Sequence, residues 1–162
     1  MPKTKIVFFD REGVLIPSTS GIHVTTSDIG TAEVLPGVIE GLQNLLLMGY
    51  CLVMVTNQEG MGTRSYPTKR FDKIQTDLFA QLRSHGIGFY KVFVCPHFKR
   101  DWCQCRKPRL GMVEAFLHEV KMDTETSFVI GNGESDCQFA REIGVSFMRM
   151  EMDGHFPIIR LE

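Results

Sequence analysis

The sequence predicts a doubly wound α/β domain, a Rossmann-like sheet of mainly parallel strands with helices on both faces. Short apolar runs of strand length alternate along the chain with segments of helical period. This alternation is typical of βαβ units, in which a helical crossover lets the next strand run parallel to the last. We expect strands at 5–10, 50–55, 91–95, 126–130 and 145–149, and helices at 37–48, 68–85, 109–120 and 134–142.

The first strand and the first two helices have clear sequence signals. The strand contains the apolar run of residues 6–9, Ile-Val-Phe-Phe, which is typical of a buried strand. Pro36 and Gly37 mark the start of the first helix, and Gly49 marks its end. Apolar side chains at helical spacing give both helices a buried stripe: Leu42, Leu45, Leu46 and Met48 in the first, and Phe71, Ile74, Leu78, Phe79 and Leu82 in the second.

Length and composition indicate one domain, residues 1–162. The chain is 43% hydrophobic and 23% charged, as in ordinary globular proteins. A net charge of −1 argues against a broad surface for nucleic acid, and no apolar run has the length of a membrane span. The N-terminal residues lack the features of a signal peptide. The five cysteines, an odd count, favour a reduced, cytoplasmic location. The oligomeric state stays open.

Residues 17–35, between the first strand and the first helix, have no clear period. A connection of that length near a ligand crevice is often a substrate loop. A plain surface excursion is the alternative.

Polar clusters follow four of the predicted strands. Asp10 and Glu12 follow the first, residues 56–58 the second, residues 106–108 the third with its loop, and residues 131–136 the fourth. In a parallel sheet the carboxyl ends of the strands lie on one edge, where ligands bind. The four clusters together therefore predict a functional site at that edge.

The residue types in these clusters suit phosphoryl transfer. A carboxylate such as Asp10 can attack phosphorus, a divalent cation offsets the repulsion between two anions, and a lysine such as Lys107 holds the transferring oxygens with a hydroxyl or amide. A second acid can protonate the leaving oxygen and later activate water. Taken singly, Asp10 could be a turn or helix-cap aspartate, Lys107 a solvated lysine, and Thr56 the end of a strand.

The loop of residues 95–105 carries a metal-ligand pattern of three thiols and one imidazole, namely Cys95, His97, Cys103 and Cys105. Zinc takes four such ligands tetrahedrally, and a set supplied wholly by protein is typical of a structural site. The alternatives are unconnected free cysteines beside a surface histidine, or a disulfide. Cys51 and Cys137 lie in apolar contexts and are expected to be buried packing residues.

These motifs resemble those of the haloacid dehalogenase superfamily of phosphotransferases. Within it, the chain resembles the histidinol-phosphate phosphatase domain of histidine biosynthesis and the related heptose bisphosphate phosphatases. The resemblance covers essentially the whole chain. It is carried, in order, by FFDREGVLI (8–16), LPGVIEGL (35–42), LVMVTNQEGMGTRSYP (52–67), VCPH (94–97), CQCRKP (103–108) and FVIGNGESD (128–136).

The resemblance implies a Mg²⁺-dependent phosphatase with no large cap domain, in which a short zinc-binding loop shapes the substrate entrance. Asp10 would be the nucleophile, and Glu12 the general acid/base. The implied Mg²⁺ ligands are Asp10, Glu12 through its main-chain carbonyl, Asn132 and Asp136. The implied phosphate-binding residues are Thr56, Asn57, Arg64 and Lys107, and the implied Zn²⁺ ligands are Cys95, His97, Cys103 and Cys105.

Two positions depart from the family pattern. The first motif is Asp-x-Asp in the family and ends in Glu12 here. The additional methylene displaces the carboxyl by roughly 1 Å, and a misplacement of that size can cost about 10²-fold in rate. The last motif begins Gly-Asp in the family and reads Gly131-Asn132 here, which removes a negative charge from a site for a hard cation.

Three functions follow from this pattern. The first is a phosphomonoesterase that forms an aspartyl-phosphate intermediate and acts on histidinol phosphate or a similar small phosphorylated metabolite. The second is a catalytically impaired member kept as a binding or regulatory module. The third is an active phosphatase for another substrate, such as a sugar phosphate of the heptose bisphosphate kind.

Overall fold

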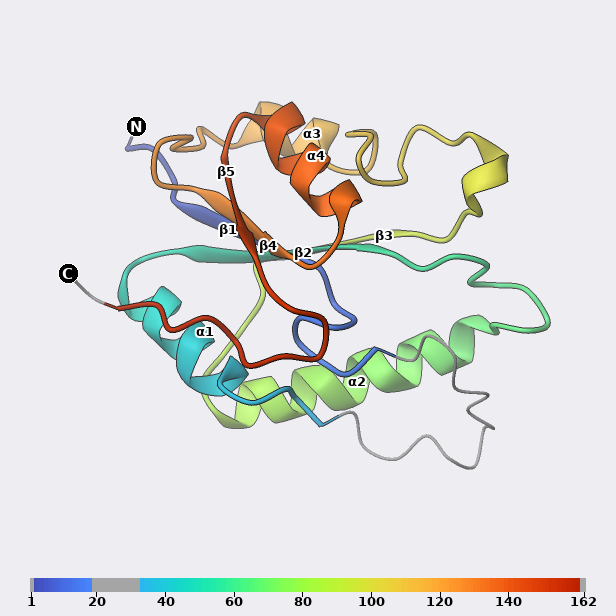
Figure 1. Cartoon of the computed structure of the whole chain (residues 1–162), viewed down its shortest axis with the longest axis horizontal. Helices are drawn as coiled ribbons and strands as arrows, with labels where there is room; N and C mark the ends of the chain where they lie inside the picture. Colours follow the sequence, from blue (N-terminus) through green and yellow to red (C-terminus); the bar gives the residue numbers. More distant parts are fainter. Residues whose placement is uncertain (1, 19–32, 161–162) are drawn as a thin grey trace.

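Five parallel strands form the centre of the protein (Figure 1) in a computed structural model that describes residues 2–18 and 33–160. The strands are β1 (Ile6–Phe9), β2 (Cys51–Asn57), β3 (Lys91–Cys95), β4 (Phe128–Gly131) and β5 (Ser146–Arg149). They lie in the order β3-β2-β1-β4-β5, and every neighbouring pair is parallel. The predicted parallel sheet is therefore confirmed, with each strand close to its expected position.

Helices cover both faces of this sheet. In Figure 1, α1 (Val38–Leu47) and α2 (Thr68–Ser84) lie on one side, and α3 (Glu114–Glu119) and α4 (Glu134–Ile143) lie on the other. A single 3₁₀ turn, η1 (Lys99–Asp101), is the regular element of the loop after β3. This arrangement is the predicted doubly wound fold, and of the predicted connection 17–35 only the two ends lie among the described residues.

The side chains of β1 alternate between the two hydrophobic layers, as the two-residue period of a strand requires. Val7 and Phe9 join the cluster that contains buried leucines of α1 and α2. Ile6 and Phe8 join the cluster of α3 and α4, where the Phe8 ring lies 5.9 Å from that of Phe139. All four β1 side chains are buried, which fixes the position of Asp10, the next residue.

The helix predicted at residues 109–120 is shorter than expected and begins at Glu114. The preceding residues form turns that dock on the loop after β3. The Gly111 N–H donates to the Gln104 carbonyl (2.9 Å), and a Cβ at position 111 would lie 2.5 Å from that oxygen. Contact with the neighbouring loop therefore overrides the helical period of the sequence here.

The direction of the chain connections changes at β1, because β2 and β3 lie to one side of it and β4 and β5 to the other. In doubly wound sheets, ligands bind outside the carboxyl ends of the strands at such a point. Within the described residues, no helix combines the length and apolarity needed to cross a membrane.

Candidate active site and metal cluster

A cavity of about 510 Å³ opens at the carboxyl edge of the sheet. Its polar lining includes residues at or after the carboxyl ends of β1, β2, β3 and β4, namely Asp10, Glu12, Asn57, Gln58, Lys107 and Asn132. The four polar clusters of the sequence therefore meet at one site, as the parallel topology predicts.

Asp10 lies directly after β1, with its carboxylate between two hydrogen-bond donors. Its Oδ1 accepts from the Arg11 main-chain N–H (2.9 Å) and lies 3.3 Å from Nζ of Lys107. Oδ2 accepts no hydrogen bond within the described part of the chain, which leaves it available for attack on a substrate. Burial raises the pKa of Asp10 to about 6, against the pull of Lys107 and with the help of the carboxylates of Asp136 and Glu12.

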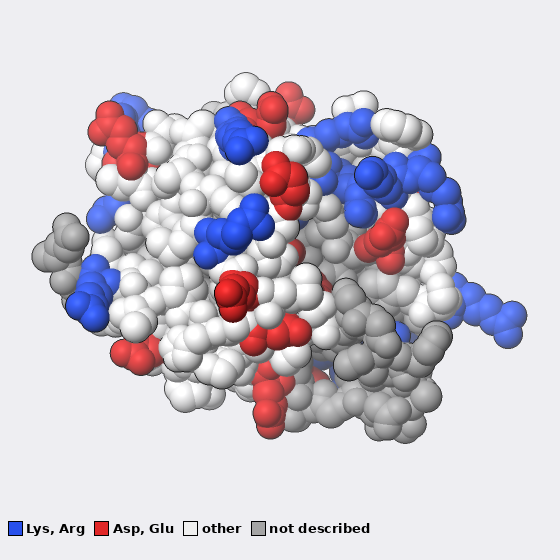
Figure 2. Space-filling model, in the orientation of Figure 1, with Lys and Arg blue, Asp and Glu red and all other residues white. Residues whose placement is uncertain are grey.

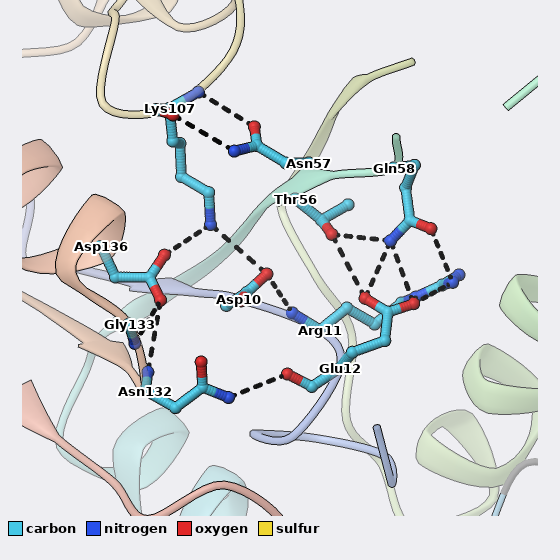
Figure 3. Close-up of polar contacts among 10 residues, drawn as sticks. All are labelled: Asp10, Arg11, Glu12, Thr56, Asn57, Gln58, Lys107, Asn132, Gly133 and Asp136. Atoms are coloured by element: carbon cyan, nitrogen blue, oxygen red, sulfur yellow. Dashed lines mark hydrogen bonds and ion pairs between the residues drawn. The ribbon is translucent and has the colours of Figure 1, made fainter. Parts of the chain in front are cut away.

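Lys107 is the internal cation of the site (Figure 3). Its side chain is 3% exposed, and Nζ lies 2.7 Å from Oδ1 of Asp136, which is 2% exposed. Burial lowers the pKa of Lys107, but the carboxylates of Asp10 and Asp136 outweigh it and raise the pKa above the ordinary value. The lysine therefore stays charged and forms ion pairs with both acids.

Asp136 is held by the start of α4. Its Oδ2 accepts from the main-chain N–H groups of Asn132 (3.2 Å) and Gly133 (3.3 Å). A Cβ at Gly131 would lie 2.4 Å from the Asp136 Cβ, so only glycine lets the end of β4 approach so closely. Both Asp136 oxygens are thus occupied by protein donors.

The residues predicted to bind phosphate have different surroundings. Asn57 uses its whole amide on the main chain of Lys107, accepting from its N–H (2.9 Å) and donating to its carbonyl (3.2 Å). Asn57 therefore fixes Lys107 in place. Thr56 is fully buried, and its Oγ1 accepts from Gln58 (2.8 Å). Arg64 is exposed and does not line the cavity.

The carboxylate of Glu12 points away from Lys107, toward Thr56, Gln58 and the Arg11 side chain (Figure 3). Oε1 accepts from Nε (2.8 Å) and Nη2 of Arg11, a residue whose side chain is 1% exposed. Gln58 Nε2 lies 3.0 Å from Oε1 and 2.8 Å from Oε2, and Thr56 Oγ1 is 3.5 Å from Oε2. Glu12 is thus anchored to the ends of β1 and β2 by an ion pair and hydrogen bonds.

Cavity residues to which the sequence assigned no role include Arg11, Gln58, Tyr66, Arg70 and Arg106. Arg11 lies between Asp10 and Glu12 in the sequence, and Gln58 and Tyr66 lie in the motif of residues 52–67. Their place in these motifs was the sequence signal for a role in the site. Their roles depend on how the loop after β2 folds back over the cavity. No local pattern shows that.

The oxygens that could hold Mg²⁺ are those of Asp10, the Glu12 main-chain carbonyl and the Asn132 side chain. Asn132 Nδ2 donates to the Glu12 carbonyl (3.1 Å), and its oxygen points to the side of Asp10 and Asp136 (Figure 3). Gly13, with a φ of 74°, makes room for this amide, since a Cβ there would lie 2.4 Å from Nδ2. Hard oxygen donors of this kind fit Mg²⁺, although only Asp10 brings a negative charge.

Cys95, His97, Cys103 and Cys105 form a compact metal-ligand cluster, with one donor atom of each within 4.8 Å of the others. Sγ of Cys95 lies 3.6 Å from that of Cys103 and 3.1 Å from that of Cys105. A tetrahedral zinc site requires sulfur atoms roughly 3.8 Å apart, so the donor set fits Zn²⁺. All five cysteines of the chain, Cys51, Cys95, Cys103, Cys105 and Cys137, are free thiols. Cys51 and Cys137 are half-buried, which is less than expected.

Basic side chains gather over the cluster (Figure 2, upper right). Arg106 Nη1 donates to the His97 carbonyl (3.2 Å), and Arg109 Nη1 donates to the Cys103 carbonyl (2.5 Å). Arg106 also lines the cavity. The loop therefore brings positive charge to the entrance of the site, which suits an anionic substrate.

Comparison with known proteins identifies the family of this chain. The model of the family described as polynucleotide kinase 3 phosphatase matches residues 5–152. The chain belongs to this phosphatase family. It is 38% identical over 144 residues to the histidine biosynthesis bifunctional protein HisB of Buchnera aphidicola, covering 89% of this chain and 40% of that protein. HisB of Campylobacter jejuni is also 38% identical, over 148 residues, with 90% and 41% covered. The chain thus spans about 40% of the length of these curated relatives.

Solved structures show the same fold. The D,D-heptose 1,7-bisphosphate phosphatase of B. bronchiseptica, solved with magnesium and phosphate, has a TM-score of 0.76 at 25% identity and covers 89% of this chain and 79% of its own. The corresponding enzyme of Burkholderia thailandensis has a TM-score of 0.58 at 20% identity, with 88% and 75% covered. The resemblance to haloacid dehalogenase phosphatases is therefore confirmed.

Proposed function

We propose that this protein is a Mg²⁺-dependent phosphomonoesterase that works through an aspartyl phosphate on Asp10 and acts on histidinol phosphate. The observation that carries the proposal is the pairing of Asp10 with the buried ammonium of Lys107 at the mouth of a polar cavity. The choice of substrate rests on the likeness to HisB proteins.

The residues support a two-step reaction. Oδ2 of Asp10 attacks phosphorus while Lys107 neutralises the phosphoryl oxygens, and the bond to the ester oxygen breaks as Glu12 gives that oxygen a proton. Glu12 then takes a proton from water, whose oxygen attacks the phosphorus and regenerates Asp10 and inorganic phosphate. Bound Mg²⁺ would offset the charge between the carboxylate and the phosphoryl group, held by Asp10, the Glu12 carbonyl and Asn132.

A sugar bisphosphate is the second candidate substrate. Arg70 and Arg106 line the same cavity as Lys107, and these additional cations suit a second anionic group on the substrate. The likeness to heptose bisphosphate phosphatases supports the same candidate. Histidinol phosphate carries an amine and an imidazole instead, so the two substrates place opposite demands on these arginines.

The test is phosphate release from histidinol phosphate and from a heptose bisphosphate, with and without Mg²⁺, by zinc-loaded protein. We expect Mg²⁺-dependent turnover of histidinol phosphate that Asp10→Asn abolishes. Asp72→Asn, which removes an exposed carboxylate on α2, is the matched control and should turn over normally. Folded, zinc-loaded protein that hydrolyses neither ester at high Mg²⁺ would contradict the proposal and favour an impaired binding module.

A further inference from the structure

Glu12 belongs to a buried polar network that extends beyond its ion pair. Arg11, Thr56 and Gln58 all contact its carboxylate, and they are 1%, 0% and 4% exposed. The Arg11 guanidinium also lies over the ring of Phe71, 4.6 Å from its centre, on α2. A fully bonded network in a buried setting holds its members in one geometry. The position of Glu12 is therefore set by its neighbours.

The Gln58 amide can adopt only one orientation in this network. Its Oε1 accepts from the Tyr66 hydroxyl (2.5 Å) and from Arg11 Nη2 (3.2 Å), and a guanidinium can only donate, whereas the ionised Glu12 carboxylate on the other side can only accept. Burial raises the pKa of Tyr66, so the hydroxyl keeps its proton at neutral pH. With its oxygen fixed by two donors, the amide must turn Nε2 toward Glu12, where it reaches both carboxylate oxygens.

We propose that Gln58, oriented by Tyr66, is a positioning residue that holds the Glu12 carboxylate for proton transfer. Neither residue touches the reacting phosphorus in this assignment. Both act through Glu12, which is the acid in the first step and the base in the second. The inference rests on the proposed function, because it assigns a role within that reaction.

The hydrogen bonds from Gln58 depend on the length of the Glu12 side chain. A glutamate carboxylate reaches the Gln58 amide at 2.8 Å and 3.0 Å. An aspartate at position 12 would withdraw it by roughly 1 Å, a displacement large enough to alter rates. The network therefore fixes the Glu12 side chain, whose additional torsion would otherwise let the carboxylate adopt several positions. Gln58 should matter less once position 12 is aspartate.

The experiment compares two substrates with different leaving groups in Gln58→Met and Tyr66→Phe. The p-nitrophenolate ion leaves without a proton, so the first step with p-nitrophenyl phosphate does not need the acid. An alkyl phosphate such as histidinol phosphate needs it in the first step. Hydrolysis of the aspartyl phosphate needs Glu12 as a base with both substrates.

We expect the rate of the p-nitrophenol burst in Gln58→Met to stay within about threefold of the wild-type rate. Steady-state turnover of both substrates should slow roughly 10- to 100-fold, within the range of general acid–base effects. Tyr66→Phe should show the same split with a smaller loss. Gln75→Met is the matched control, since Gln75 contacts Arg11 (3.1 Å) and not the carboxylate, and the ratio of burst to turnover should stay at the wild-type value.

A double-mutant cycle with Glu12→Asp completes the test. In that background we expect Gln58→Met to cost several-fold less than in the native chain, because the contact is already lost. An equal cost in both backgrounds, or parallel loss of burst and turnover in Gln58→Met, would overturn the positioning role alone. Turnover of either substrate that survives Asp10→Asn would overturn the aspartyl-phosphate proposal and this role with it.

Discussion

The polar cavity and the Cys–His cluster lie at the same edge of the sheet but balance charge in different ways. In the cavity, Lys107 lies between Asp10 and Asp136, and Arg11 pairs with Glu12, so the chain supplies its own cations. In the cluster, three thiols and an imidazole converge within 4.8 Å, and thiolates so close together require a cation from outside the chain.

The cavity and the cluster therefore owe their structural order to different causes. The strand ends and α4 preorganise the cavity, because its acids are neutralised within the fold. The cluster lies on a loop whose regular structure is the single turn η1 and whose described residues are largely exposed or half-buried. We infer that the fold creates the cavity and that zinc completes the loop. Each prediction below tests one side of this contrast.

Removal of zinc should have the largest effect, and it should be local. Structural zinc contributes apparent binding free energies of about 10 kcal/mol or more in small zinc domains. We expect a chelator to lower amide protection in residues 95–105, because the loop opens more often, while β1 and β4 stay protected, as measured by hydrogen exchange with mass spectrometry. Cys105→Ser should reproduce the pattern, and Cys51→Ser, outside the cluster, should not. Unchanged amide protection of the loop after verified zinc loss would contradict the inference that zinc orders the loop.

Loss of the internal cation should destabilise the cavity side. Lys107→Met leaves Asp10 and Asp136 without their shared partner, and breaking a buried ion pair typically costs about 3–5 kcal/mol. The measurement is urea denaturation of zinc-loaded protein at neutral pH. Lys69→Met, at an exposed position of α2, is the control and should change stability by less than about 0.5 kcal/mol. Adding Asp136→Asn to Lys107→Met should recover part of the loss.

The sequence predicted much of this contrast, because its main features are local. The run at residues 6–9 and the four polar clusters gave the strand positions and the common edge, and the spacing of Cys95, His97, Cys103 and Cys105 gave the cluster. The network around Glu12 could not be predicted, since Tyr66 and Gln58 meet only through the folded loop. The late start of α3 had the same cause, a tertiary contact between Gly111 and Gln104.

Thiol reactivity in zinc-free protein should rank the cluster residues. Burial raises the pKa of Cys103, but hydrogen bonds from the Arg106 N–H and the neighbouring thiols outweigh it and lower the pKa to about 7. Burial, with the contact to Cys105, raises the pKa of Cys95 to about 12. Since the thiolate is the nucleophile, Cys103 should be alkylated first, with a rate that rises as the pH increases through about 7. Peptide mapping after iodoacetamide treatment measures the order. Earlier modification of Cys95 would contradict it, and added zinc should protect all three thiols.

Asn132→Asp should have the smallest effect of these changes. It tests whether Asn132 belongs to a metal site in the cavity. The amide now donates to the Glu12 carbonyl (3.1 Å), a bond that joins β4 to the loop after β1 without a metal. A carboxylate would instead place an acceptor against that carbonyl, which weakens the metal-free state, and would add a charge for Mg²⁺. We expect Mg²⁺ to bind about tenfold more tightly, close to 1.4 kcal/mol, as measured by titration calorimetry. Gln43→Glu adds the same charge at an exposed position of α1 and should leave the affinity unchanged. Equal affinities in Asn132→Asp and wild type would mean that Asn132 lies outside the metal site. A gain confined to Asn132→Asp would mean that the native chain has exchanged part of its affinity for Mg²⁺ for a hydrogen bond within the fold.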